Sequence, residues 1–181
     1  SLFLRLLDSG ASSRTVSYDG RDVVSHAAAS ASVNATVIMS ILSAAGVSFT
    51  RPSCFGKRPL HYIAEHATVE GITLFLRQAG VKKYINDPDF SGYTPFLCAA
   101  QRGRREACAL LQLQGAILSS TTDMNENCLH IACAYGHADL VAWLLLVVPP
   151  DYIYAKASDA LPDCIAAAVH SQSVGILSSL L

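Results

Sequence analysis

The chain is poor in charged residues and lacks the short motifs that mark many enzymes. Charged residues make up 15% of its 181 residues, against roughly a quarter in a typical soluble domain, and the net charge is -1. A net charge so close to zero gives no overall attraction to nucleic acid or to an acidic membrane surface. The glycine-rich phosphate loops and the G-x-S-x-G nucleophile motif are absent from the sequence. We therefore expect neither catalysis nor nucleic-acid binding.

Long hydrophobic runs are also missing. Hydrophobic residues make up 51% of the chain, yet the apolar run at 143–148 is far shorter than the ~20 residues that a membrane span needs. No secretory leader is recognisable at the N-terminus. We expect no direct membrane contact from this segment. The chain begins without Met, and we expect further sequence beyond both ends.

Short similar segments recur along the chain at a nearly constant interval. Three of them can be laid over one another: residues 58–61, 94–97 and 127–130. Their second positions are 36 and 33 residues apart, and a weaker copy at 161–167 follows 34 residues later. A period in the low to middle thirties is typical of a solenoid, whose units stack in one dimension.

These segments resemble the ankyrin repeat, whose hallmark is a Thr-Pro-Leu-His-x-Ala turn at the start of the first of two antiparallel helices. The unit that begins at Ser91 fits best, with Thr94-Pro95, Gly103 and Gly115-Ala116 at the family's positions. The resemblance implies an all-α ankyrin-repeat solenoid of stacked helix-turn-helix units with short hairpin fingers. One ankyrin repeat domain then covers 1–181, made of a partial unit 1–18, units 19–54, 55–90, 91–123 and 124–157, and a truncated unit 158–181.

The best unit shows how the sequence sets its two helices. Thr94 can cap the first helix with its hydroxyl, Pro95 suits the first helical position, and Gly103 ends the helix. The second helix is expected at 105–114, where apolar residues recur at the 3.6-residue spacing of a buried stripe. Equivalent second helices are expected at 69–78, 138–147 and 172–181. Their paired apolar residues should form one buried spine: Leu74-Phe75, Leu110-Leu111 and Trp143-Leu144.

The cysteines are even in number, which invites a disulfide interpretation. They are Cys54, Cys98, Cys108, Cys128, Cys133 and Cys164. All except Cys54 fall on helical positions that the repeat pattern turns inward, where a free thiol behaves as a small hydrophobic group. Reduced thiols are therefore expected. They favour a cytoplasmic location, or the cytosolic face of a membrane if the chain is part of a larger membrane protein.

Two constellations could carry chemistry, and each has a plainer interpretation. The C-x-H-x-x-C segment at 128–133 offers three soft ligands, but zinc sites usually use separate short-spaced pairs, and these residues fall at packing positions. Cys54 and His66 with Glu65 could form a nucleophile pair, yet no oxyanion element accompanies them. The basic residues at 102–105 are interpreted as a solvated face. We therefore expect no metal, no cofactor and no catalytic residue.

In this family the hairpin fingers and the ends of the first helices line a concave groove. The repeat frame places Tyr18, Arg21, Glu65 and Gln101 there. It also places there the residues that we expect to bind a partner: Phe55, Lys57, His66, Phe90, Tyr93, Arg102, Met124, Glu126 and Tyr135. Their four aromatic rings occupy positions that packing does not require, and aromatic and Arg side chains dominate binding hot spots. The alternative is that the rings are ordinary exposed apolar groups, or that two of them pack against neighbouring fingers.

The leading functional hypothesis is a non-catalytic, monomeric interaction module that binds a protein or peptide in the concave groove. The alternative is that the array is the regulatory or substrate-recruiting portion of a larger enzyme. A DHHC-type membrane acyltransferase and a kinase are examples of enzymes that carry such arrays. The partner's identity does not follow from the sequence, because a fold does not imply a function.

Overall fold

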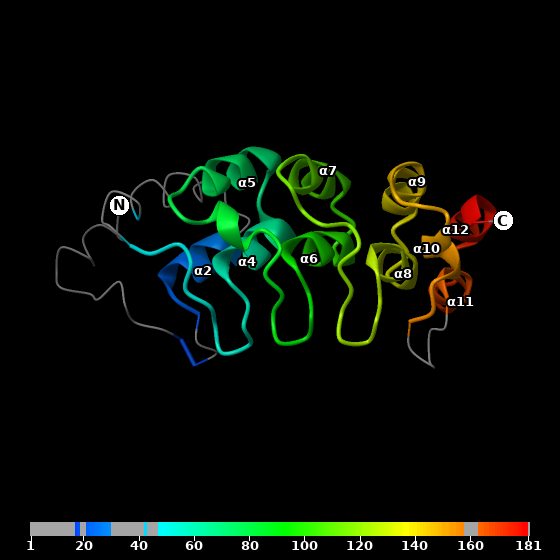
Figure 1. Ribbon diagram of the computed structural model, residues 1–181, viewed down its shortest axis with the longest axis horizontal. Helices are drawn as coiled ribbons and strands as arrows, with labels where there is room; N and C mark the ends of the chain where they lie inside the picture. The colour runs from blue at the N-terminus through cyan, green and yellow to red at the C-terminus, as the bar shows by residue number, and fades with distance from the viewer. Residues whose placement is uncertain (1–16, 19–20, 30–41, 43–46, 158–162, 181) are drawn as a thin grey trace.

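The computed structural model describes residues 17–18, 21–29, 42, 47–157 and 163–180, and its helices stack side by side in two rows (Figure 1). The first row holds α2 (Val23–Ala29), α4 (Pro59–His66), α6 (Pro95–Gln101), α8 (Cys128–Ala134) and α11 (Cys164–His170). The second row holds α5 (Val69–Leu76), α7 (Arg105–Leu113), α9 (Ala138–Val147) and α12 (Val174–Leu180). The described part of the chain is thus an all-α solenoid of helix pairs.

Several expected segments fall outside the described residues. They are nearly all of the partial unit 1–18, residues 19–20, 30–41 and 43–46 of the unit 19–54, and residues 158–162 and 181 of the truncated unit. The division of the chain into units stays a prediction. Within the described ranges no helix combines the length and the apolar character that crossing a bilayer requires, and α9 has ten residues.

The first helices begin at the expected residues because side chains satisfy their free N–H groups. Thr94 Oγ1 accepts a hydrogen bond from the Leu97 N–H at 3.3 Å, and Pro95 is the first residue of α6. Asn127 does the same for α8, since its Oδ1 accepts from the N–H groups of Leu129 and His130 at 2.9 and 3.0 Å. Asn therefore replaces Thr at this cap without loss of the hydrogen bond.

Gly103 follows α6 for two reasons. Its φ of 67° lies in the left-handed region that favours glycine. In addition, a Cβ at this position would stand 2.5 Å from Nδ1 of His137, a residue of the next unit. The imidazole of His137 uses this space to reach the Gln101 carbonyl oxygen, 2.8 Å from its Nε2. Gly103 thus ends the helix and leaves room for a contact between units.

The second helices confirm the expected positions, with small differences at the ends. The helix expected at 138–147 has these bounds, and those expected at 69–78, 105–114 and 172–181 are slightly shorter. Extra residues in the longer connections form the 3-10 helix η1 (Lys82–Tyr84) after α5 and the short helix α10 (Asp151–Tyr154) after α9.

The expected spine of paired apolar residues is only half right. Phe75, Leu111 and Leu144 are fully buried between the helix pairs, whereas 43% of Leu74 is exposed. Leu110 and Trp143 are half-buried and pack against the edge of the core. An α-helix turns by about 100° per residue, so two consecutive side chains cannot both point at the same neighbour.

Three hairpins project from one side of the array, below the first-row helices in Figure 1. They cover residues 53–57, 89–93 and 122–126. In each, the N–H of the first residue donates to the carbonyl oxygen of the fifth, at 2.8, 2.9 and 3.0 Å respectively. The fourth residue has a positive φ, which Gly56, Gly92 and Asn125 adopt.

Backbone hydrogen bonds join each hairpin to the next. The Phe90 N–H donates to the Phe55 carbonyl oxygen at 3.1 Å, and the Asp123 N–H donates to the Ser91 carbonyl oxygen at 3.1 Å. These bonds repeat at equivalent positions of successive hairpins. The side of the array formed by the three hairpins and the first-row helices, here called the inner face, is therefore held together along its length.

Candidate binding site on the inner face

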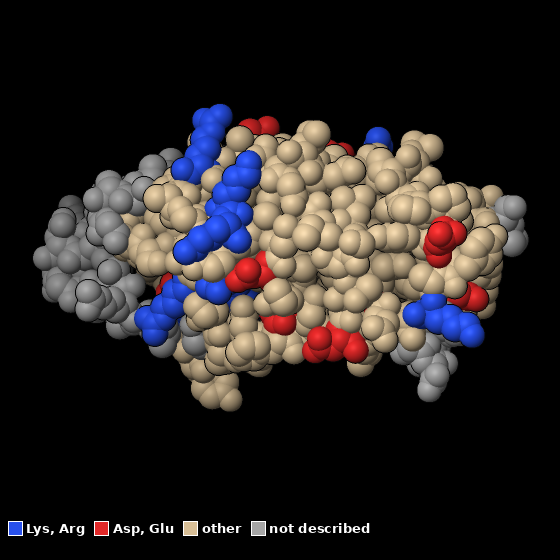
Figure 2. Space-filling view, viewed as in Figure 1, with Lys and Arg blue, Asp and Glu red and all other residues tan. Residues whose placement is uncertain are grey.

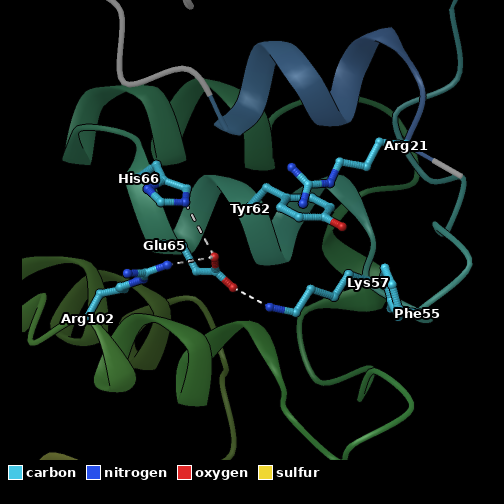
Figure 3. Close-up of a pocket in the computed structure, with 7 residues that line it drawn as sticks. All are labelled: Arg21, Phe55, Lys57, Tyr62, Glu65, His66 and Arg102. Carbon is cyan, nitrogen blue, oxygen red and sulfur yellow. Dashed lines mark hydrogen bonds and ion pairs between the residues drawn. The ribbon is translucent and has the colours of Figure 1, made fainter. Parts of the chain in front are cut away.

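A cleft of about 280 Å³ opens on the inner face beside the first hairpin and the ends of α4 and α6 (Figure 3). Its walls come from four places in the chain: the segment before α2, the first hairpin, α4 and the residue after α6. The lining residues are Arg21, Phe55, Lys57, Tyr62, Glu65, His66 and Arg102. The stacking of three units thus brings together residues as far apart in sequence as 21 and 102.

A buried carboxylate is the centre of the cleft. The Glu65 side chain is only 6% exposed, and its Oε1 accepts a hydrogen bond from Lys57 Nζ at 2.6 Å. Its Oε2 lies 3.4 Å from His66 Nε2 and 4.0 Å from an Nη of Arg102. Figure 3 shows these three side chains converging on Glu65 from different sides. The carboxylate therefore has a close ionic partner in Lys57 and a more distant one in Arg102.

Glu65 and Lys57 stabilise each other's charge. Burial alone would raise the pKa of Glu65, but the hydrogen bond and charge of Lys57, with a hydrogen bond from the Cys98 thiol, hold it below its ordinary value. Burial alone would lower the pKa of Lys57. The hydrogen bond to Glu65 and the negative charges nearby, including that of Glu65, raise this pKa above its ordinary value. Both groups are therefore ionised at neutral pH.

Tyr62 forms an aromatic surface under the cations. The Arg21 guanidinium carbon lies 4.7 Å from the centre of the Tyr62 ring, and Lys57 Nζ lies 5.9 Å from it. The Tyr62 hydroxyl donates to Ser53 Oγ at 3.3 Å, which holds the buried ring against the first hairpin. Figure 3 shows Arg21 extended across this ring.

His66 is a neutral member of the site at pH 7. Burial lowers its pKa, and the positive charges of Arg102, Arg104 and Lys57 lower it further, against the opposing attraction of Glu65. The lining residues thus carry three cations and one carboxylate. This is an excess of two positive charges in a chain whose net charge is -1.

A second group of side chains continues along the inner face. Gln101 Nε2 donates to the Tyr135 hydroxyl at 2.8 Å, and the Tyr135 ring stacks on His137 with 6.3 Å between ring centres. Burial raises the pKa of Tyr93, and electrostatic interactions with Glu126 and Tyr135 act in the same direction. Tyr93, Glu126 and Tyr135 therefore lie in one neighbourhood.

The structure places the expected binding residues in three settings. The cleft contains Phe55, Lys57, His66 and Arg102; the tips of the second and third hairpins carry Phe90 and Met124; the second group contains Tyr93, Glu126 and Tyr135. Both the concave groove and the role of these residues in binding stay predictions.

Two of the four aromatic positions need a correction. Tyr93 is half-buried and packs against the core, so packing does require this ring. Phe90 is 76% exposed, yet a Cβ on Gly56 would lie 2.6 Å from its ring, so one side of Phe90 covers the neighbouring hairpin. By contrast, Phe55 and Tyr135 are more than half exposed.

The interpretation of residues 102–105 as a solvated basic face is wrong for one residue. Arg104 is half-buried and donates to the carbonyl oxygens of Ala64, at 3.3 Å, and Ala67. Both carbonyls lie at the C-terminal end of α4, where free acceptors and the helix dipole favour a cation. Arg102 and Arg105 are exposed. Figure 2 shows basic side chains gathered toward the α4 and α5 end of the viewed face, with most of the remaining surface uncharged.

The structure places the histidine and cysteine residues considered for chemistry in different settings. In the C-x-H-x-x-C segment, His130 Nδ1 lies 3.4 Å from the Asn127 N–H, and the two thiols are buried. In the ranges that the structure describes, no three His, Cys, Asp or Glu side chains gather as a metal site requires. His66 pairs with Glu65, while Cys54 lies on the first hairpin.

Comparison with known proteins agrees with this architecture. Residues 69–152 match the family model for ankyrin repeats, in three copies. Residues 69–152 are therefore ankyrin repeats, and the described part of the chain is an all-α ankyrin solenoid. Ankyrin repeats are in general protein-protein interaction modules without catalytic activity.

A curated relative carries the same kind of repeat. The chain is 29% identical over 100 residues to the ankyrin repeat protein nuc-2 of Neurospora crassa. The aligned part covers 55% of this chain and 9% of nuc-2, so the chain spans less than a tenth of that protein's length.

Proposed function

We propose that this chain recognises a protein or peptide partner through its inner face and performs no chemistry of its own. The observation that carries the proposal is a run of large exposed side chains along that face, on the three successive hairpins and just after α8. Phe55, Phe90, Met124 and Tyr135 are each more than half exposed. Large aromatic and flexible Met side chains supply much contact area per residue, which is why they are common at binding surfaces.

The backbone of the inner face supports this use. Hydrogen bonds from Phe90 to Phe55 and from Asp123 to Ser91 fix each hairpin relative to the next. A surface that is ordered before binding loses little conformational entropy when a partner docks. The exposed side chains are therefore presented at fixed spacings along the array, as an extended partner requires.

The proposal includes a monomeric array in the cytoplasm, which the reduced, buried thiols support. The alternative function, recruitment of a substrate to a larger enzyme such as a DHHC-type acyltransferase or a kinase, would use the same inner face. The sequence of the parent open reading frame separates the two, because only the second requires a catalytic domain in the same polypeptide.

A display library of random dodecapeptides, selected on the whole chain, tests the proposal. For selected peptides we expect Met124→Ala and Tyr135→Ala each to weaken binding by roughly 1–3 kcal/mol. Leu113→Ala and Leu146→Ala serve as controls, because these exposed residues lie on the second-row helices α7 and α9. Peptides whose binding responds to the controls and not to the inner-face variants would contradict the proposal, as would a selection that yields no binders.

A further inference from the structure

We infer that the cleft around Glu65 receives an acidic side chain of the partner, an Asp or Glu carboxylate, with Arg102 as its main ligand. This inference rests on the proposed function and specifies the chemistry of one part of the partner. It starts from the excess of positive charge in the cleft, where Arg21, Lys57 and Arg102 surround the single carboxylate of Glu65.

The three cations of the cleft differ in how closely they contact neighbouring groups. Lys57 is held at 2.6 Å by Glu65 Oε1, and Arg21 lies against the Tyr62 ring. Arg102 differs, because its side chain is 55% exposed and its nearest Glu65 oxygen is 4.0 Å away, beyond hydrogen-bond distance. An Arg guanidinium presents a planar fork of N–H donors that matches both oxygens of a carboxylate. Of the three cations, Arg102 is therefore the most exposed and is not hydrogen-bonded to Glu65, which suits it to bind an incoming carboxylate.

The surroundings favour a singly charged carboxylate over a phosphate dianion. The helices α4 and α6 both end at the cleft, at His66 and Gln101, and helix C-termini carry partial negative charge. Glu65 adds a full negative charge in the same place. A dianion would meet twice the repulsion from these groups, and the cost of removing an ion from water rises with its charge.

The shape of the cleft predicts which kind of residue lies next to the acidic residue in the partner peptide. Phe55 is 57% exposed at one wall, and the buried ring of Tyr62 forms the surface below the cations. An acidic side chain can place its carboxylate at Arg102, while the Tyr62 ring stays covered by Arg21 and Lys57. An apolar neighbour in the peptide would cover Phe55. The expected motif is thus an acidic residue next to an apolar one.

The test uses the whole chain and four pools of random dodecapeptides, each with one fixed central residue: Glu, Gln, Lys or phosphoserine. We expect the Glu pool to bind about tenfold more tightly than the Gln pool at 0.15 M salt, and the difference to shrink in 0.5 M salt. Arg102→Gln should remove the preference for Glu, and Arg102→Glu should shift it to the Lys pool. Arg105→Gln is the matched control, because it removes the same charge three residues away at an exposed position on α7.

The outcomes distinguish this inference from the proposed function. Equal binding of the Glu and Gln pools, tighter binding of the phosphoserine pool, or an equal effect of Arg102→Gln and Arg105→Gln would each overturn the acidic-side-chain inference. If binding were then still lost in Met124→Ala and Tyr135→Ala, the inner face would remain the binding surface. If no pool bound, both proposals would fall. Urea unfolding of each variant confirms that it is folded.

Discussion

His61 Nε2 lies 3.0 Å from the carbonyl oxygen of Tyr93, so a buried imidazole at the start of α4 is tied to the hairpin of the next unit. Its Nδ1 accepts a hydrogen bond from the Arg58 N–H at 3.1 Å. This geometry suits the neutral ring, with its proton on Nε2. Protonation would turn Nδ1 into a second donor facing the Arg58 N–H.

We predict that stability falls as the pH drops below about 6.5, the ordinary pKa of His. Burial lowers the pKa of His61 in the folded state, so the unfolded chain binds a proton first. The contribution is thus present above pH 6.5 and is lost as the pH falls toward the folded-state pKa. The urea midpoint should decrease between pH 7.5 and 5.5. His61→Gln should reduce this dependence, whereas exposed His170→Gln should not; a midpoint that rises on acidification would contradict the sign.

Arg104 should stabilise the junction between two units. Its bonds to the carbonyl oxygens of Ala64 and Ala67 are charge-assisted and half-buried, so Arg104→Ala should lower the free energy of unfolding by about 1–3 kcal/mol. Arg105→Ala removes the same charge from an exposed site and should change it by less than about 0.5 kcal/mol. Urea unfolding measures both, and equal effects would show that Arg104 acts only as a surface charge.

The second-row core should be more sensitive at Leu144 than at its neighbour Trp143. Leu144 is fully buried in α9, so Leu144→Ala should cost about 2–5 kcal/mol through the cavity it leaves. Trp143 is half-buried, so Trp143→Ala should cost less despite the larger side chain. A larger loss for Trp143→Ala would show that the ring, and not the buried leucine, joins α9 to the rest of the array.

The cysteines should differ sharply in reactivity. All six are free, and every one except Cys54 is buried. Burial raises the pKa of Cys128 to about 12 and shifts Cys98 and Cys108 in the same direction, which keeps these thiols protonated and slow to react. In native protein, N-ethylmaleimide should modify Cys54 first, as seen by mass spectrometry. Modification of all six at one rate, or a stoichiometric disulfide, would refute this.

The sequence predicted the helix pairs well because the residues that begin and end helices act locally. Thr94, Pro95 and Gly103 each work through their own backbone neighbourhood, which the repeat pattern exposes. The prediction of a buried spine was wrong at Leu74 and Trp143. Two consecutive apolar residues in a sequence do not show which of the two faces the neighbouring helix.

The candidate cleft was harder to predict because its geometry depends on contacts between units. Tyr62 sits inside an apolar helical stripe, and nothing in that stripe distinguishes an aromatic surface under two cations from an ordinary core ring. Arg21 and Glu65 fell in the expected groove but not among the expected binding residues. The one signal for Glu65 was that it is the single acidic residue of α4, eight residues after Lys57. The role of Arg104 needed the position of α4, which only stacking supplies.

Amide hydrogen exchange with and without a bound, selected peptide tests the central claim most directly. If the inner face binds the partner, protection should increase at the hairpins 53–57, 89–93 and 122–126 and at the end of α6. Exchange in α5, α7 and α9 of the second row should stay unchanged. Protection confined to the second-row helices, or spread evenly over both rows, would contradict recognition through the inner face.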